Sequence, residues 1–218
     1  MPSESYAAAD TERSWEIYER LALRYPDAIV IGGWGTWLHV KAEKSHDIDL
    51  IVTFADMARL RSELEVTESS HIGGRKWRST FDGIHLDLYV PHQSELGDKL
   101  KMPVEALAPH VAAIDGHRTL SKEALIVAKS AARLDRPDTL PGKKDAVDMA
   151  RIVLEASGEW DWAQVGVIAD ASKSAAKPGR FWVAEALASA LEAQETKDLR
   201  RRLSQIIQPA IKQLTDPS

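Results

Sequence analysis

The chain has 218 residues and a formal net charge of −5, from 28 basic and 33 acidic side chains. Hydrophobic residues make up 44% and charged residues 28%, a balance that excludes a disordered or fibrous chain. The acidic excess argues against a protein that coats nucleic acid non-specifically.

Three further absences bear on location. No apolar run approaches the ~18 residues that a membrane span needs, and the polar N-terminal stretch lacks the apolar core of a signal peptide. Cysteine is absent, which excludes disulfides and thiolate sites. We therefore expect a cytoplasmic protein with no membrane partner.

The first half of the sequence alternates short apolar runs with helical patterns. Strands are predicted over residues 28–31, 48–52 and 84–90, and helices over residues 10–24, 32–40 and 56–64. Residues 70–80 are expected to pair with the strand over 84–90 through a hairpin turn at Asp82 and Gly83. This half therefore has a mixed α/β pattern.

The second half has only helical patterns. Helices are predicted over residues 121–134, 143–156, 161–170, 180–194 and 197–213, with a loop over 136–142. The expected fold class is α/β (α+β): a small mixed-sheet domain over residues 1–117, followed by a helical domain over residues 118–218.

A pair of glycines follows the first strand and opens a helix. Glycine lets a backbone approach a ligand closely, and the free N–H groups at a helix start favour phosphate. The pair is not the dinucleotide fingerprint, because position 37 is Trp rather than Gly, and no Gly-Lys-Ser/Thr follows as in a P-loop. Gly32 and Gly33 are therefore candidates for a phosphate site of another kind.

Three aspartates follow the glycines in strand-like positions. Asp47 and Asp49 are alternate residues, so their carboxylates lie on one face ~6–7 Å apart, and Asp87 lies on the polar face of the strand over 84–90. Adjacent carboxylates repel one another unless they share a cation, and Mg²⁺ prefers such oxygen ligands. Three convergent carboxylates beside a phosphate-binding turn predict a two-metal phosphoryl-transfer site.

This order of motifs resembles the DNA polymerase beta-like nucleotidyltransferase superfamily. The resemblance rests on Gly32-Gly33, the D-x-D pair at Asp47 and Asp49, and Asp87. Lys44-Ser45-His46 is similar to the lead-in before D-x-D in the AbiEii-type branch, which includes toxins of bacterial toxin–antitoxin systems. The likeness covers residues 28–156; Gly-Gly in place of the common Gly-Ser, and a long gap before D-x-D, are departures from the pattern.

The resemblance implies roles for particular residues. Gly32, Gly33 and Ser45 would hold the triphosphate of a nucleotide. Asp47, Asp49 and Asp87 would hold one or two Mg²⁺ ions, which Mn²⁺ could replace, and Asp87 could deprotonate the attacking hydroxyl. In the second half the resemblance assigns phosphate contacts and their orientation to Lys129, Lys144, Asp145 and Asp148.

Plainer interpretations of several of these and other residues stay open. Lys129 and Arg133 stand four apart and could form a solvated helix face. Asp145 and Asp148 could be charges that the helix dipole favours in a first turn. Trp34 is expected in the core rather than as a platform for a base. Residues 71–78 and 200–202 are basic and could contact RNA or simply be solvated.

The implied reaction moves a nucleoside monophosphate from an NTP to an acceptor hydroxyl. The AbiEii resemblance implies an RNA acceptor, a tRNA 3′ end, for a toxin with a cognate antitoxin as partner. One alternative keeps the fold and changes the acceptor to a small molecule such as an aminoglycoside, or to a protein hydroxyl. Another is a catalytically silent nucleotide-binding protein.

Overall fold

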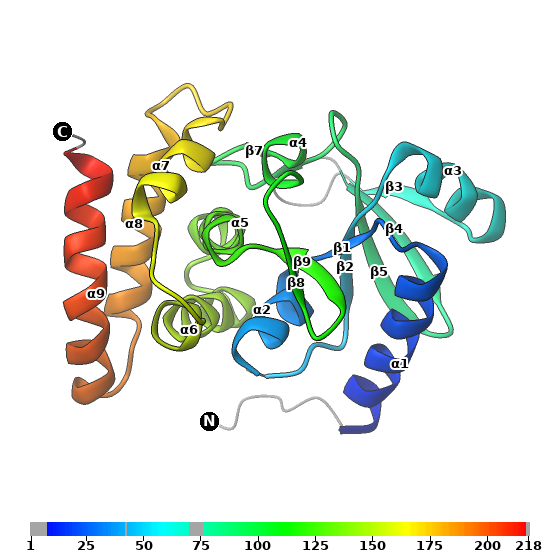
Figure 1. Cartoon of the computed structure of the whole chain (residues 1–218), viewed down its shortest axis with the longest axis horizontal. Helices are drawn as coiled ribbons and strands as arrows, with labels where there is room; N and C mark the ends of the chain where they lie inside the picture. Colours follow the sequence, from blue (N-terminus) through cyan, green and yellow to red (C-terminus); the bar gives the residue numbers. More distant parts are fainter. Residues whose placement is uncertain (1–7, 42, 70–75, 217–218) are drawn as a thin grey trace.

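The computed structural model describes residues 8–41, 43–69 and 76–216. A seven-stranded sheet is flanked on one side by α1 and α3 and on the other by the helices of the second half, α5 to α9 (Figure 1). We refer to residues 8–120 as the sheet lobe and to residues 121–216 as the helical lobe. The predicted fold class is confirmed.

The sheet is mixed, with the strand order β3-β4-β5-β2-β1-β9-β8. Its central strand β2 is antiparallel to β1 and parallel to β5, while β1 is parallel to β9. The strands are β1 (Ile29–Val30), β2 (Ile48–Ile51), β3 (Thr67–Ser69), β4 (Lys76–Phe81), β5 (Ile84–Tyr89), β8 (Val111–Ile114) and β9 (His117–Leu120). A separate two-stranded sheet joins β6 (Glu95–Leu96) and β7 (Met102–Pro103).

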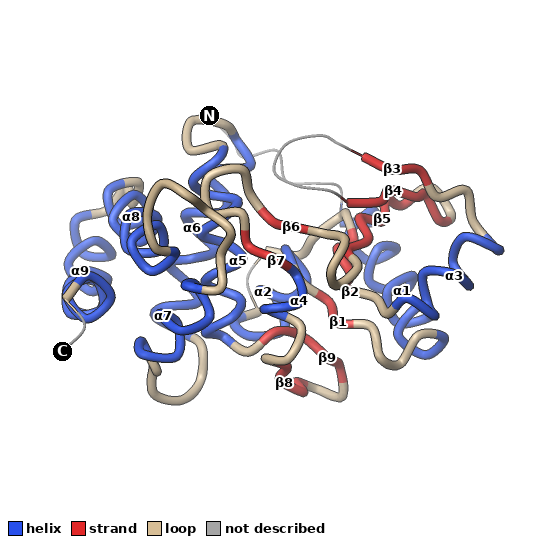
Figure 2. Tube along the Cα trace, turned by 90° about the horizontal axis from the view of Figure 1, so that it is seen from above, coloured by secondary structure: helices blue, strands red, loops and turns tan. Residues whose placement is uncertain are grey.

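The helices divide between the two lobes, as Figure 2 shows from above. The sheet lobe contains α1 (Ala8–Arg24), α2 (Gly32–Val40), α3 (Phe54–Glu63) and α4 (Val104–Leu107). The helical lobe contains α5 (Lys122–Asp135), α6 (Leu140–Glu155), α7 (Trp162–Asp170), α8 (Gly179–Glu192) and α9 (Lys197–Thr215). Helix α2 contacts both α5 and α6, so it links the lobes.

Each face of the sheet belongs to a different hydrophobic core. Leu50 and Leu88 pack with residues of α1, α2 and α3. Their neighbours Ile51 and Tyr89 point to the opposite face and pack with residues of α5 to α9. The helical lobe therefore shares its core with the sheet. The domain boundary at residue 117 stays a prediction, although the sheet continues through β9 to Leu120.

The structure confirms the predicted helices and central strands, and the largest difference in a helix boundary is at the start of α6. Helix α6 begins at Leu140, three residues before its predicted start, and Pro141 lies in its first turn. Proline is well tolerated there because the first N–H groups of a helix have no partner within it. The Asp82–Gly83 turn joins β4 to β5 as predicted, but residues 70–75 of the predicted partner strand lie outside the described residues.

The alternation of apolar and polar residues is too short to predict the other strands. Strands β3, β6, β7, β8 and β9 have two to four residues each. Within the described parts of the chain, no helix is long and apolar enough to cross a membrane.

The shared core predicts that truncating one central side chain will destabilise the protein. Leu125 of α5 is completely buried. We expect Leu125→Ala to lower the free energy of unfolding by about 2–5 kcal/mol, because it leaves a cavity where the lobes meet. Urea denaturation followed by circular dichroism measures the change. Leu23→Ala on exposed α1 surface is the matched control, expected within about 0.5 kcal/mol of the wild type.

Candidate active site

The glycine pair brings α2 directly against β2. Gly32 has a φ of +63°, and a Cβ at this position would overlap the carboxylate of Asp49. Only glycine therefore allows the first turn of α2 to approach Asp49 so closely. The preceding residue, Ile31, provides no side-chain cap, so the first N–H groups of α2 are not capped by the residue before them.

Two polar side chains from distant segments surround the second glycine. A Cβ on Gly33 would lie 2.7 Å from Ser45 Oγ and 3.8 Å from Lys144 Nζ. Ser45 is buried and precedes β2, while Lys144 belongs to the first turns of α6. The structure thus brings together Gly33, Ser45 and Lys144, all three predicted, at the positive end of the α2 dipole.

The three predicted carboxylates follow the register of the two parallel strands. Asp49 on β2 is the register partner of Asp87 on β5. Their side chains lie on the same face of the sheet as those of Ile51 and Tyr89, which come two residues later in each strand. This face packs against the helical lobe. Asp47 immediately precedes β2 and lies 3.3 Å from His46 through Oδ2.

Asp47 and Asp49 carry negative charge that the cations of the described residues do not fully compensate. Asp47 Oδ1 is buried and has no hydrogen-bond partner among the described residues. Burial and the nearby charge of Asp87 raise the pKa of Asp49 to about 6, although Lys76 and Lys129 oppose this rise. A cation between these two carboxylates would relieve both effects.

Asp87 is in a different electrostatic state. It accepts hydrogen bonds from Lys76 Nζ and, at 2.9 Å, from Nε of Arg78, its register partner on β4. Burial alone would raise the pKa of Asp87, but the bonds from Arg78 and Lys76 hold it below its ordinary value. In this arrangement no group of three or more His, Asp or Glu within the described residues is placed to hold a metal ion.

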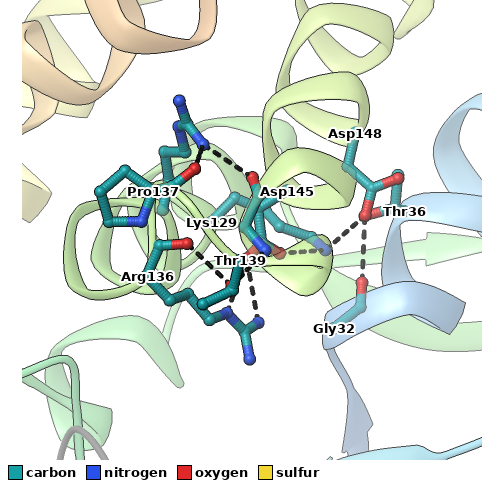
Figure 3. Close-up of polar contacts among 10 residues, drawn as sticks. Gly32, Thr36, Lys129, Arg136, Pro137, Thr139, Asp145 and Asp148 are labelled. Atoms are coloured by element: carbon teal, nitrogen blue, oxygen red, sulfur yellow. Dashed lines mark hydrogen bonds and ion pairs between the residues drawn. The ribbon is translucent and has the colours of Figure 1, made fainter. Parts of the chain in front are cut away.

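The helical lobe contributes a buried ion cluster that faces α2. Lys129 of α5 donates to Asp148 at 2.6 Å and to Asp145 at 3.4 Å, both on α6. Burial alone would lower the pKa of Lys129, but Asp148 and Asp145 outweigh it and raise this pKa above its ordinary value. Figure 3 shows the cluster beside Gly32 and Thr36, where Thr36 Oγ1 donates to the Gly32 carbonyl.

This cluster decides between the alternatives left open for these residues. Lys129 and Arg133 do not form a solvated helix face, since both are buried. Asp145 and Asp148 are also buried and orient Lys129, rather than standing as solvated first-turn charges. The resemblance had implied this orienting role, but the lysine is so fully paired that little of it is accessible to a ligand.

Sequence reasoning missed Arg136, which belongs to the same cluster. Its Nε donates to Asp145 at 2.9 Å, and Asp145 is therefore shared between Arg136 and Lys129. The residue lies at the end of α5, in a segment whose prolines and glycine indicate only a turn. No apolar or polar periodicity in the sequence identifies Arg136 as a site residue. The only sequence signal for its ion pair is Asp145, nine residues later in the chain.

The other basic and aromatic candidates lie elsewhere. Trp34 is buried in the core and donates to Ser14, as expected. Arg200 and Arg201 make local contacts with Gln194 and Asp198. Contact of these arginines with RNA stays a prediction, and residues 71–75 of the basic segment lie outside the described residues.

Comparison with known proteins identifies the fold. No protein-family model matches the chain, and no curated protein matches it by sequence. Among solved structures, it is similar to an antigenic nucleotidyltransferase-like protein from Paracoccidioides brasiliensis. The identity is 14%, with 92% of this chain and 97% of that chain covered and a TM-score of 0.50.

Two further solved structures are similar at lower TM-scores. JHP933 from Helicobacter pylori has 12% identity, coverage of 96% of this chain and 95% of that chain, and a TM-score of 0.49. ANT(2")-Ia in complex with adenylyl-2"-tobramycin has 17% identity, coverage of 72% and 95%, and a TM-score of 0.45. The likeness to the Paracoccidioides protein shows that this chain has a nucleotidyltransferase-like fold.

The raised pKa of Asp49 predicts a pH-dependent cost to stability. The unfolded carboxyl titrates near its ordinary value and the folded one at about 6, so ionisation above that range disfavours the fold. We expect Asp49→Asn to raise the melting temperature at pH 7.5, with a gain that shrinks as the pH falls from about 6 to about 4 and is absent at lower pH. Thermal melts across this pH range test it, with exposed Asp138→Asn as control; an equal gain at every pH would contradict the assignment.

The buried ion cluster predicts a large loss when its lysine is removed. Lys129→Met keeps most of the unbranched side chain but leaves Asp145 and Asp148 without their shared cation. We expect the free energy of unfolding to fall by about 3–5 kcal/mol in denaturant titrations. Lys143→Met, at an exposed lysine of α6, is the control. A loss below about 1 kcal/mol for Lys129→Met would show that the cluster does not stabilise the packing of α5 against α6.

Proposed function

We propose that this protein is a Mg²⁺-dependent nucleotidyltransferase, which transfers a nucleoside monophosphate from an NTP to an acceptor hydroxyl and releases pyrophosphate. The observation that carries the proposal is the packing of Asp49 against Gly32. It puts a pair of acidic side chains beside the uncapped start of a helix, within a nucleotidyltransferase-like fold. A catalytically silent protein would have no need of this costly arrangement.

The start of α2 is suited to the phosphates of the nucleotide. Free backbone N–H groups and the positive end of the helix dipole both attract anions. Ser45 Oγ and Lys144 Nζ are the side-chain donors nearest to Gly33, so they would complete a phosphate site. Lys129 would act on this site indirectly, because Asp145 and Asp148 already occupy its ammonium group.

Asp47 and Asp49 fit a divalent cation. Mg²⁺ takes carboxylate oxygens together with substrate phosphates, and Mn²⁺ has similar preferences. Asp47 offers a buried oxygen that accepts no hydrogen bond from the part of the chain that the structure describes, and Asp49 has a raised pKa that an adjacent cation would lower. When bound, the metal would offset the charge that develops on the transferred phosphoryl group.

The role of Asp87 depends on its two ion pairs. Lys76 and Arg78 keep this carboxylate ionised and positioned next to Asp49. To accept the proton of the attacking hydroxyl, or to share a metal, Asp87 would have to exchange one of these partners. We propose this exchange as the event that accompanies binding of the acceptor.

For the acceptor we propose an RNA 3′ end, that of tRNA, in the cytoplasm, with the protein acting as a toxin held by a cognate antitoxin. The support is the resemblance of Lys44-Ser45-His46 and of Lys144, Asp145 and Asp148 to the AbiEii-type pattern. Arg78, whose side chain is 46% exposed beside Asp87, is available to an RNA phosphate when it is not paired.

The test is transfer of label from each α-labelled NTP, in the presence of Mg²⁺ and total RNA. We expect label in a tRNA-sized band, lost on chelation of the metal and reduced by about 100-fold or more in Asp49→Ala. Asp138→Ala, which changes an exposed aspartate away from the site, should keep full activity.

Other outcomes would contradict different parts of the proposal. Label on an added aminoglycoside or on protein, and none in RNA, would overturn the acceptor but keep the reaction. Full activity of folded Asp49→Ala would overturn the assigned site. Absence of transfer with every NTP and acceptor, together with absence of NTP binding, would overturn the function.

A further inference from the structure

Three cationic side chains of the helical lobe lie near the acidic pair Asp145 and Asp148, and they differ in how much of each is left for a ligand. Lys129 is 7% exposed and bound by both carboxylates. Arg133 is 6% exposed and donates to the carbonyl groups of Pro137 and Gly142. The side chain of Arg136, in contrast, is 40% exposed although its partner Asp145 is buried. Of these three, Arg136 is the cation that a ligand can reach.

The segment that carries Arg136 is rigidly built. The Arg136 carbonyl accepts hydrogen bonds from both the N–H and the hydroxyl of Thr139. Gly142 packs on the same carbonyl so closely that a Cβ would overlap it. Arg133 also donates hydrogen bonds to two carbonyl groups of this segment, those of Pro137 and Gly142. The backbone of Arg136 is therefore held in one place before any ligand binds.

The guanidinium group is held along one edge. Both Nε and Nη2 of Arg136 lie 2.9 Å from the same oxygen, Asp145 Oδ2. Arginine presents five N–H donors in a planar fork, so this contact leaves other donors of Arg136 available. Asp145 is thus a positioning residue: it fixes the orientation of the arginine without covering it.

The cluster places this arginine next to the proposed reaction site. Figure 3 shows Arg136, Asp145, Lys129 and Asp148 in one row that leads to Gly32 and Thr36 of α2. Gly32 in turn packs against the carboxylate of Asp49. Burial alone would lower the pKa of Arg136, but the charges of Asp145 and, to a smaller extent, Asp49 raise it, so Arg136 and Asp49 are close enough to interact. The exposed edge of the Arg136 guanidinium group therefore belongs to the same site as Asp47 and Asp49.

We propose that Arg136 binds the phosphate chain of the nucleoside triphosphate, held in position by Asp145. This inference rests on the proposed function and deepens it. Three carboxylates lie where a polyanion must bind, so the site needs cations that stay charged at every working pH. Arg136 meets this need with a preorganised fork that matches phosphate oxygens, which lowers the entropy lost on binding.

Binding measurements test the role of Arg136 apart from catalysis. Wild type and Arg136→Gln are each titrated calorimetrically with every NTP in the presence of Mg²⁺. Both proteins are also titrated with inorganic tripolyphosphate and Mg²⁺, a probe without base or sugar. We expect both ligands to bind about 10- to 100-fold more weakly to the variant. Arg151→Gln, which removes an exposed arginine of α6, should bind as the wild type does.

The outcomes separate this inference from the function on which it rests. NTP binding by wild type that is unchanged in Arg136→Gln overturns the inference alone. Weaker NTP binding with unchanged tripolyphosphate binding also overturns it, because the arginine would then contact the base or sugar. A wild type that binds neither ligand overturns the proposed function as well.

A folding defect is distinguished by a second variant. Arg136→Lys keeps the charge and the pairing with Asp145 but loses the fork, so its affinity for tripolyphosphate should lie between those of wild type and Arg136→Gln. Melting temperatures of all variants are measured alongside. If Arg136→Lys retains the melting temperature and the full affinity of the wild type, the fork is not what binds phosphate and the proposal fails.

Discussion

The contact between Gly32 and the carboxylate of Asp49 is the constraint on which the site depends. Because Gly32 has no Cβ, α2 begins in van der Waals contact with the acidic edge of β2. Any other residue at this position would push the helix start away from the carboxylate. The same contact aligns an anion-attracting helix end with a cation-attracting pair of aspartates, which are the two features that a metal-bound phosphate requires.

The second organising feature is the buried ion cluster on α5 and α6. In this buried cluster the ammonium group of Lys129 pairs with the carboxylates of Asp145 and Asp148. Each charge therefore offsets the desolvation cost that its partner would otherwise carry. The hydrophobic core that surrounds them also includes Ile51 and Tyr89 from the sheet. The ion cluster therefore joins α5 to α6, and the apolar core holds the helical lobe against the acidic face, where it brings Lys144 and Arg136.

Much of this arrangement could be predicted from local patterns. The apolar run of β2, the alternation in β5 and the glycines before α2 each have a direct physical meaning, and the structure bears out these elements. Short strands such as β8 and β9 could not be predicted, because a few residues do not establish a period. The start of α6 was predicted late because proline and glycine indicate a turn, although a first helical turn accepts both.

Local sequence patterns alone indicated the main helices, the central strands and the face of the sheet on which the aspartates lie, since alternation along a strand needs no tertiary information. Tertiary structure alone decided which charges meet. Arg78 reaches Asp87 because β4 and β5 pair in one particular register, and Lys129 reaches Asp145 and Asp148 because two helices pack side by side. The state of each ionisable group depends on partners distant in the chain and on exclusion of water, which no local pattern of residues contains.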